Sequence, residues 1–262
     1  MQTSSPETAQ TSAEAEDDAV ARFLTDYADP MRPRQASIDA ERPNPLPKAS
    51  RLLAEALAAR RITVKKVVEG RWVFEFAGST IGGYSLSDDG RGVTTLVSAQ
   101  ARRVLSDAAK LRAHLDLMEI PHPAPLPVAD AEEPTEPLFD LEILAPKPSG
   151  SSLQVRTYVV GPEAISVLVI VPDADGRALS VDVTDAASPE ISTLAVDAMR
   201  AVPGLLCASV ALQVRSLDSA EGAEVIGIDE AASIVPHHFP RLGRGRAVAD
   251  AVAEQILFTA AL

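Results

Sequence analysis

Residues 188–212 read SPEISTLAVDAMRAVPGLLCASVAL, and this stretch decides the fold class. Ser188, Pro189 and Glu190 are typical of a helix start: a serine cap, a proline at the first position and an acid in the first turn. They predict a helix over 191–202. A largely apolar run over 205–214 follows at once and predicts a buried strand. A helix that leads directly into such a strand indicates a mixed α/β protein.

The sequence on both sides supports an α/β (α+β) fold. Downstream, we expect strands at 138–144, 153–160, 164–171 and 224–228 and a last helix at 247–258. Upstream, Ser50 caps a helix whose face includes Leu52, Leu53, Ala56 and Leu57. Strands at 62–68 and 72–76, a Gly- and Asp-rich loop at 78–92 and helices at 95–105 and 108–118 come next. The predicted order is a small α/β unit followed by a larger one.

Composition shifts divide the chain into four parts. Residues 1–48 begin with a polar, acidic tail, expected to be disordered, and continue into an extended linker with five prolines between 30 and 47. One short amphipathic helix is predicted at 19–27. Residues 49–125 form the first folded unit and 138–262 the second. Residues 126–137, which are acidic and rich in proline, form a linker between them.

The charge of the chain disfavours nucleic acid as a partner. Its 24 basic and 37 acidic residues give a net charge of −13. The excess acid is concentrated in residues 1–30 and 130–142, where it repels phosphate backbones. No apolar run reaches the roughly 20 residues that a membrane helix needs, so no membrane role is expected. The single cysteine, Cys207, lies in the apolar run LLCASVAL and is predicted to be structural. A lone cysteine and a polar N-terminus favour the cytoplasm.

Two segments resemble a known family. VRTYVVGPEAISVLVI at 155–170 and IVPHHFPRLGRGRAVADAVAEQIL at 234–257 resemble the ATP-grasp ligases. The nearest branch is that of the cyanophycin-synthetase and glutathione-synthetase-like carboxylate–amine ligases. The resemblance covers about residues 49–125 and 138–260. It implies a small pre-ATP-grasp α/β unit and then a truncated ATP-grasp-like antiparallel sheet with flanking helices.

The resemblance also implies where metal and nucleotide would bind. The family's magnesium ligands fall on Ala211, Gly227 and Asp229, of which the first two have no side-chain oxygen. Asp229 and its neighbour Glu230 are therefore the expected metal residues. Arg156 falls on a family arginine near the phosphates, and Arg246 falls on one beside the substrate. We expect these two arginines to be the cofactor- or anion-binding residues, and we assign no catalytic residue.

Other parts of the family's machinery are missing from the expected positions. In DAAKLRAHLDLMEIPHP, residues 107–123, the phosphate-binding lysine falls on Ala108. Lys110 lies two helical positions away and is rotated by about 200°, so it is not expected to substitute. About a dozen residues separate Pro127 from Phe139, too few for the family's lid. We expect the lid to be deleted, although Lys147 could be a relic of it.

Simpler interpretations of the same residues stay open. Asp229 and Glu230 also suit an ordinary turn at a strand end. His237 and His238 could hold a metal, but neighbours on an extended chain point opposite ways. Arg241, Arg244 and Arg246 could form a solvated basic face.

Two functions from different classes follow from these observations. The leading hypothesis is a non-catalytic ATP-grasp-like binding or scaffold protein that acts through a protein or peptide partner. This hypothesis requires no cofactor. The protein could also form a homo- or hetero-oligomer. The alternative is an ATP- and Mg²⁺-dependent carboxylate–amine ligase with a shortened lid that a second subunit completes. An unrelated α/β interaction domain is the third possibility.

Overall fold

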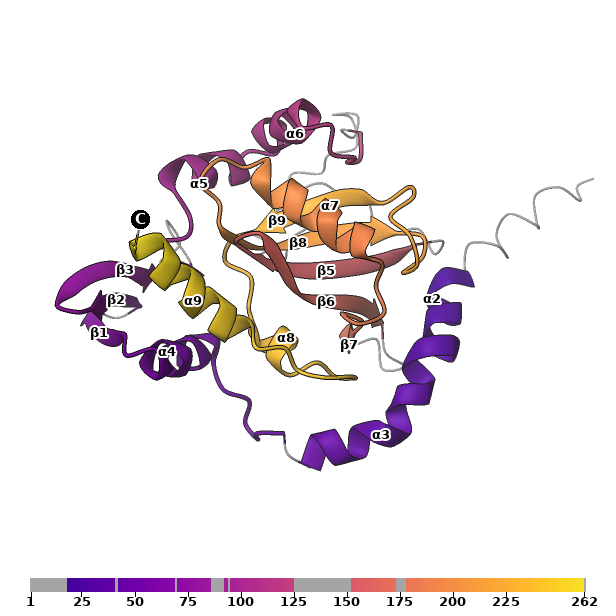
Figure 1. The fold of residues 1–262 in the computed structure, drawn as a ribbon. Helices are drawn as coiled ribbons and strands as arrows, with labels where there is room; N and C mark the ends of the chain where they lie inside the picture. Colours follow the sequence, from indigo (N-terminus) through magenta and orange to yellow (C-terminus); the bar gives the residue numbers. More distant parts are fainter. Residues whose placement is uncertain are drawn as a thin grey trace, which may run out of the picture.

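A computed structural model describes residues 18–40, 42–68, 70–85, 92–93, 95–124, 152–172 and 178–261. These residues form two antiparallel sheets joined by helices, with an N-terminal helical arm along one side (Figure 1). The fold class predicted from the sequence is confirmed. The predicted acidic tail, the linker 126–137, the strand at 138–144 and Lys147 lie outside the described residues. No helix of the described ranges is both long and apolar enough to span a lipid bilayer.

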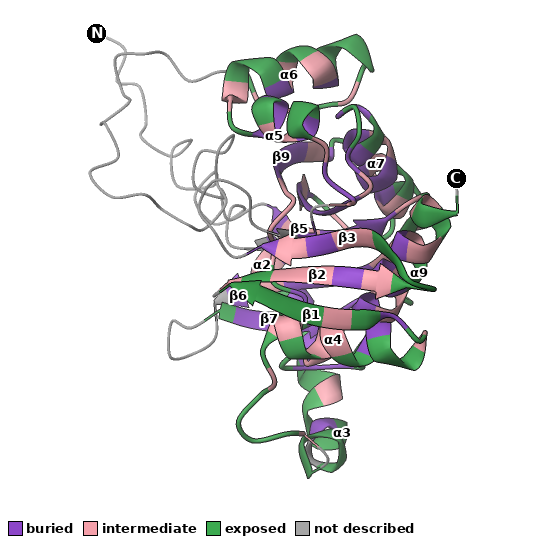
Figure 2. Cartoon of the chain, turned by 90° about the vertical axis from the view of Figure 1, so that its left-hand side faces the viewer, coloured by how far each residue is buried: buried purple, intermediate pink, exposed green. Residues whose placement is uncertain are grey.

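The small unit is a four-stranded sheet covered by one helix. Helix α4 (Ala49–Ala59) precedes strands β1 (Thr63–Val68), β2 (Arg71–Phe76), β3 (Ser79–Ser85) and β4 (Gly92–Val93), which pair in the order β1-β2-β3-β4. Helix α4 buries Leu53 and Leu57 against Phe74. Figure 2 shows that the outer face of this sheet is largely exposed, above all along β1.

The prediction of a loop at 78–92 was wrong for its first half, which forms β3. The glycines that suggested a loop instead permit a bulged strand. Gly82 has a φ of 151° and sits where the register of β2 and β3 shifts. A side chain at Gly82 would overlap that of Thr95, so the close approach of the next segment requires glycine here.

Two helices connect the units. Helix α5 (Ala99–Leu105) is capped by Ser98, and α6 (Ala108–Leu117) by Asp107. Each capping oxygen accepts from backbone N–H groups that have no partner in the first turn. Their apolar faces pack against the core of the larger sheet.

The large sheet has the strand order β7-β6-β5-β8-β9, with every neighbouring pair antiparallel. Its strands and following helices are β5 (Leu153–Val160), β6 (Glu163–Pro172), β7 (Ala178–Asp182), α7 (Pro189–Arg200), β8 (Cys207–Val214), β9 (Glu224–Asp229), α8 (Val235–His238) and α9 (Val248–Ala260). The predicted helix start is confirmed, because the Ser188 hydroxyl accepts from the Glu190 N–H at 3.2 Å.

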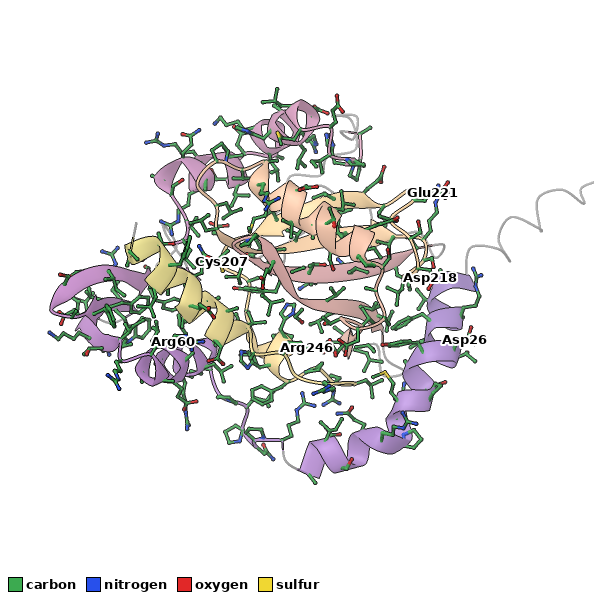
Figure 3. All side chains as sticks on the ribbon, viewed as in Figure 1. Asp26, Arg60, Cys207, Asp218, Glu221 and Arg246 are labelled. Atoms are coloured by element: carbon green, nitrogen blue, oxygen red, sulfur yellow. The ribbon has the colours of Figure 1, made fainter. Side chains whose placement is uncertain are left out.

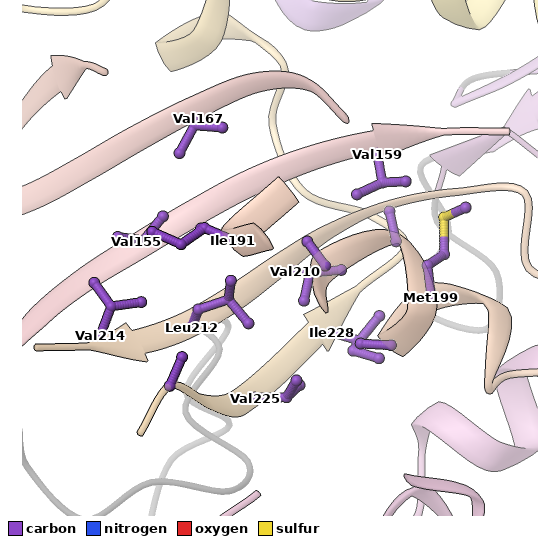
Figure 4. Packing of buried hydrophobic residues seen from close by; sticks show 14 of the residues in the cluster. Val155, Val159, Val167, Ile191, Met199, Val210, Leu212, Val214, Val225 and Ile228 are labelled. Atoms are coloured by element: carbon purple, nitrogen blue, oxygen red, sulfur yellow. The ribbon is translucent and has the colours of Figure 1, made fainter. Parts of the chain in front are cut away.

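Alternate residues of this sheet face two different cores. Val155, Val210 and Leu212 point toward α7, whose Ile191 and Met199 complete the packing (Figure 4). On the opposite face, Tyr158, Val160 and Cys207 pack against α9. Helix α9 also contacts α4, and Arg60 at the end of α4 donates to Asp250 at 2.7 Å, so α9 joins the two sheets (Figure 3). The remainder of that second face is where the candidate site lies.

The N-terminal arm corrects the prediction of an extended linker. Helix α2 (Asp18–Phe23), a π-helical turn η1 (Leu24–Ala28) and α3 (Asp29–Ala40) continue through Pro30 and Pro33. Pro30 directly follows the π-helical turn η1. Burial of Phe23 and Ala28 in the large core offsets the bond that Pro33 cannot make. The predicted helix at 19–27 is present as α2 and η1.

Candidate functional site

Five residues form one row across the large sheet. Asp182 of β7 pairs with Leu168 of β6, and Leu168 pairs with Arg156 of β5. Arg156 also pairs with Ala211 of β8, which pairs with Gly227 of β9. Paired residues of neighbouring strands point to the same face. This face is opposite α7, because Val155, Val210 and Leu212 point the other way. We call the five residues the cross-sheet row.

Ala211 and Gly227, where the resemblance implies metal ligands, are direct neighbours in this row. They are adjacent in space although 16 positions apart in sequence, as two ligands of one ion must be. Neither has a side-chain oxygen. A Cβ built on Gly227 meets nothing within 4 Å, and its φ is not positive, so the backbone would accept a larger side chain. The pair therefore supplies no side-chain ligand to a metal ion.

Asp229 and Glu230 lie at the end of β9. Asp229 pairs with Ser209, two residues along from the row and on the same face. One of its carboxylate oxygens accepts from the Ala231 N–H at 2.7 Å, which is the geometry of an Asx turn. Glu230 lines a cavity of about 30 Å³ between α4, β3 and this turn, which has room for about two waters. Within the described ranges, no cluster of three or more His, Cys, Asp or Glu side chains could hold a metal ion.

Arg156 lies in the middle of the cross-sheet row. Its Nε is buried and has no hydrogen-bond partner among the described residues, and its guanidinium forms no ion pair there. Gln154, two positions earlier and therefore on the same face, has a buried Nε2 that also lacks a partner in the described part. Two unmatched donors thus lie along one strand of this face.

Arg246 is held by two carboxylates. It lies in the loop between α8 and α9 (Figure 3) and donates to Asp182 at 2.7 and 3.2 Å and to Asp185 at 2.8 and 3.1 Å. Hydrogen bonds to Asp185 and then Asp182 raise the pKa of Arg246 further, and the same contact lowers the pKa of Asp185. Sequence reasoning missed Asp182 and Asp185. The alternation of apolar and polar residues in ALSVD, which forms β7, could have predicted this strand and placed Asp182 at its end.

His237 and His238 have separate structural partners. The Nδ1 of His237 lies 2.8 Å from the Ser166 hydroxyl, and its ring makes an edge contact with Tyr158. Burial lowers the pKa of His237 to about 3, and the charges of His238 and Arg156 act in the same direction. The Nε2 of His238 accepts from the Ala249 N–H at 2.9 Å, in the first turn of α9. His238 therefore caps α9, because Ala247 at the cap position has no suitable side chain.

The remaining predicted positions are accounted for locally. Ala108 packs against the large core, and Lys110 forms an ion pair with Asp107 at 2.8 Å on the surface. Cys207 is buried, as predicted, and burial raises its pKa to about 11. A thiol with such a pKa is not a nucleophile at neutral pH.

Comparisons with known proteins place the fold. No protein-family model and no curated protein matches the sequence. Among solved structures, the chain is similar to a bifunctional glutathione synthetase from Pasteurella multocida, with a TM-score of 0.62 and 12% identity over 80% of this chain and 44% of that one. The ATP-grasp ligase PsnB, in its complex with a phosphomimetic variant of its minimal precursor, Mg and ADP, also matches. Its TM-score is 0.32 and its identity 14%, over 42% of this chain and 32% of that one.

These likenesses concern fold alone. At 12% identity the glutathione synthetase gives no evidence on activity, and the PsnB match is too partial to support an argument. The chain spans less than half the length of the glutathione synthetase that it matches. With the two antiparallel sheets and their flanking helices, this similarity shows an ATP-grasp-like fold.

Proposed function

We propose that this protein is a non-catalytic relative of the ATP-grasp ligases, which binds a protein or peptide partner and transfers no phosphate. One observation carries the proposal. The two paired positions where the family resemblance implies magnesium ligands are Ala211 and Gly227, which offer no ligand atom.

The chemistry of phosphoryl transfer supports this reading. Transfer to a carboxylate depends on positioning and on neutralising the charge of the phosphates, chiefly by magnesium and basic side chains. Magnesium requires hard oxygen ligands in near-octahedral geometry. Asp229 and Glu230 are the residues that would hold any residual cation, yet one oxygen of Asp229 already closes a turn. The residues present therefore do not fit magnesium nucleotide.

The basic residues also argue against binding of a polyphosphate. Arg246 is neutralised by Asp182 and Asp185, and Ala108 replaces the phosphate-binding lysine that the resemblance implies. Among the described residues that the resemblance implies for anion binding, Arg156 is the one that no carboxylate engages. An isolated guanidinium supplies too little charge to hold a polyphosphate without metal.

Restoring the missing ligands tests the proposal. We expect the wild-type chain to bind Mn²⁺, a paramagnetic substitute for Mg²⁺, too weakly to detect at millimolar concentration by electron paramagnetic resonance. The double variant Ala211→Asp/Gly227→Glu places two carboxylates beside Asp229 and should gain millimolar or tighter binding. The isosteric Ala211→Asn/Gly227→Gln variant controls for the added volume and should gain much less.

Two results would contradict the proposal. One is tight Mn²⁺ binding by the wild-type chain that Asp229→Asn abolishes. The other is formation of ADP by the wild-type chain in the presence of carboxylates and amines, which would favour the alternative of an active carboxylate–amine ligase.

A further inference from the structure

Helix α9 exposes an apolar side chain beside an open groove. Phe258 is 61% exposed, in the C-terminal half of the helix (Figure 2). It borders a groove of about 300 Å³ between α9 and the β5–β6 hairpin, which we call the α9 groove. A lone exposed apolar residue is ordinary on a protein surface. An exposed phenylalanine at the edge of such a groove is typical of a binding surface, because ligand pockets begin at about this volume.

The helical wall of the α9 groove is not the face that α9 buries. Ala251, Gln255 and Phe258 line the groove, and their spacing of four and three residues places them in one stripe. Val252 and Ile256, which are buried between the sheets, lie about 100° around the helix. Helix α9 therefore carries a second, partly apolar stripe that no described element covers. A helix with apolar residues on more than one side is usually covered on more than one side.

The opposite wall is formed by the hairpin and is fixed in place. Val160, Pro162 and Ile165 line the groove from this side, and Val160 is buried. Between them, Gly161 has a φ of 57°, and a Cβ there would lie only 2.5 Å from the side-chain oxygen of Gln255. The turn thus approaches α9 as closely as a glycine permits. Packing holds both walls, so the groove is already formed before anything binds.

The rim of the α9 groove is acidic. Glu163 and Glu254 line it, and none of its described lining residues is basic. Glu163 is exposed and forms no ion pair with a described residue. Glu254 is 79% exposed and approaches Arg60 only to 4.0 Å, because Arg60 makes its shorter contact of 2.7 Å with Asp250. The two carboxylates are therefore open to a cation from outside, and they disfavour an anionic occupant.

The surface continues across the hairpin turn. A second hollow of about 440 Å³ lies on its other side, and Pro162 and Glu163 line both hollows. Arg200 is the one base among the described residues of this second hollow, and Asp197 pairs with it at 3.6 Å. An occupant that passes over the turn meets Glu163 from either direction. The extent of the surface suits a segment of polypeptide better than a small molecule.

The same acids disfavour a second copy of this chain as the occupant. In a two-fold symmetric contact the α9 groove would face its own counterpart. The contact would then bring Glu163 and Glu254 of one copy against the same acids of the other. Like charges across an interface are destabilising, so charge complementarity favours a different, basic partner.

We propose that the α9 groove is a docking site for a basic amphipathic segment of a partner protein. An apolar side chain of that segment enters the groove beside Phe258, and flanking Lys or Arg side chains face Glu163 and Glu254. This inference rests on the proposed function and names the surface and the chemistry of its partner. It follows the general mode in which an amphipathic helix places its apolar stripe in a groove.

The test uses model peptides and the full chain. A fluorescently labelled two-heptad peptide of leucine and lysine, with leucine at the a, d and e positions, should bind with a Kd on the order of 10 μM by anisotropy. The same peptide with serine in place of leucine should bind at least about tenfold more weakly, because it lacks the apolar anchor. The peptide with glutamate in place of lysine should not bind detectably.

Matched variants separate the anchor from the charges. Phe258→Ala should weaken the leucine–lysine peptide at least about tenfold, whereas Phe76→Ala removes an exposed aromatic ring of the small sheet and should change nothing. Glu163→Gln/Glu254→Gln should weaken it about fivefold and reduce its dependence on salt.

A second pair of acids controls for net charge. Asp218→Asn/Glu221→Gln removes the same charge from two exposed residues at the far end of the molecule (Figure 3) and should change the Kd less than about twofold. All the replaced side chains are exposed, and circular dichroism checks that each variant is folded.

Four results would each overturn the inference. They are no binding of the leucine–lysine peptide, an unchanged Kd in Phe258→Ala, an equal loss in the two double variants, and binding of the glutamate peptide as tight as that of the lysine peptide. Sedimentation equilibrium adds one more, since wild-type dimers that Phe258→Ala dissociates would show that a second copy covers the groove. If the peptide fails and Mg-ATP also fails to bind, only the docking site is wrong. If Mg-ATP binds, the proposed function fails, whatever the peptide does.

Discussion

Replacing Arg246 by methionine should destabilise the protein by about 3 kcal/mol, because it leaves Asp182 buried without its cation. The side chain of Asp182 is 5% exposed and that of Arg246 is 19% exposed, so their 2.7 Å contact is largely shielded from water. Removing one partner of a buried pair costs about 3–5 kcal/mol. The incomplete burial of Arg246 favours the lower end of that range.

The second carboxylate adds little to this figure. Asp185 is 72% exposed, and an ion pair with such a group contributes about 0–1 kcal/mol. We therefore expect Asp185→Asn to cost less than about 1 kcal/mol. The double variant Arg246→Met/Asp182→Asn should recover part of the loss, because it also removes the unpaired charge.

Urea unfolding at pH 7, followed by circular dichroism, measures these differences. Arg244→Met is the matched control, since Arg244 is exposed two residues earlier in the same loop. A free energy of unfolding for Arg246→Met within about 0.5 kcal/mol of wild type would refute the reasoning. It would mean that the ion pair of Arg246 with Asp182 does not stabilise the fold and that Arg246 is available for a ligand.

Three further predictions concern His237, His238 and Cys207. The pKa of His237 is about 3 in the folded chain and 6.5 in the unfolded chain, because burial disfavours the charged imidazole. The folded protein therefore keeps its full stability above pH 6.5 and loses stability as the pH falls toward 3. The loss is about a factor of ten in the folding equilibrium per pH unit. Urea unfolding of wild type and His237→Asn across this range should show the steeper loss in wild type; parallel curves would contradict it. His238→Ala should cost about 1 kcal/mol by removing the cap of α9, and an unchanged urea midpoint would argue against that role. Iodoacetamide should modify Cys207 only as fast as the chain unfolds at pH 8, because burial raises its pKa to about 11; rapid modification of the native chain would show that the thiol is accessible.

Local signals in the sequence were sufficient to locate most elements. Ser188 and Pro189 mark the start of α7 because their effects act within one helical turn. The caps of α5 and α6 are Ser98 and Asp107, and neither of them was singled out from the sequence. The apolar runs of β5 and β8 were detectable because both strands are largely buried on their two faces.

The errors come from contacts between distant residues. The arm was predicted as an extended linker because of Pro30 and Pro33, and its helix depends on packing of Phe23 and Ala28 into a core more than a hundred residues away. Strand β3 was missed because its glycines serve a bulge and a close approach to Thr95.

The same limit applies to the candidate site. The sequence singled out Arg156, Ala211 and Gly227 separately, but only strand pairing brings them into one row. It could not reveal that Arg246 is engaged by Asp182, since the two residues are 64 positions apart. Gln154 gave no signal in the sequence, because a glutamine on a strand is ordinary until its amide is found buried and unmatched.

Calorimetric titration of the purified wild-type chain with Mg-ATP tests the central claim most directly. We predict no measurable heat of binding at millimolar nucleotide, because the paired positions Ala211 and Gly227 supply no ligand to the metal. Saturable binding with a Kd near 0.1 mM, about −5.5 kcal/mol, would contradict the claim. It would indicate that the chain retains a working nucleotide site.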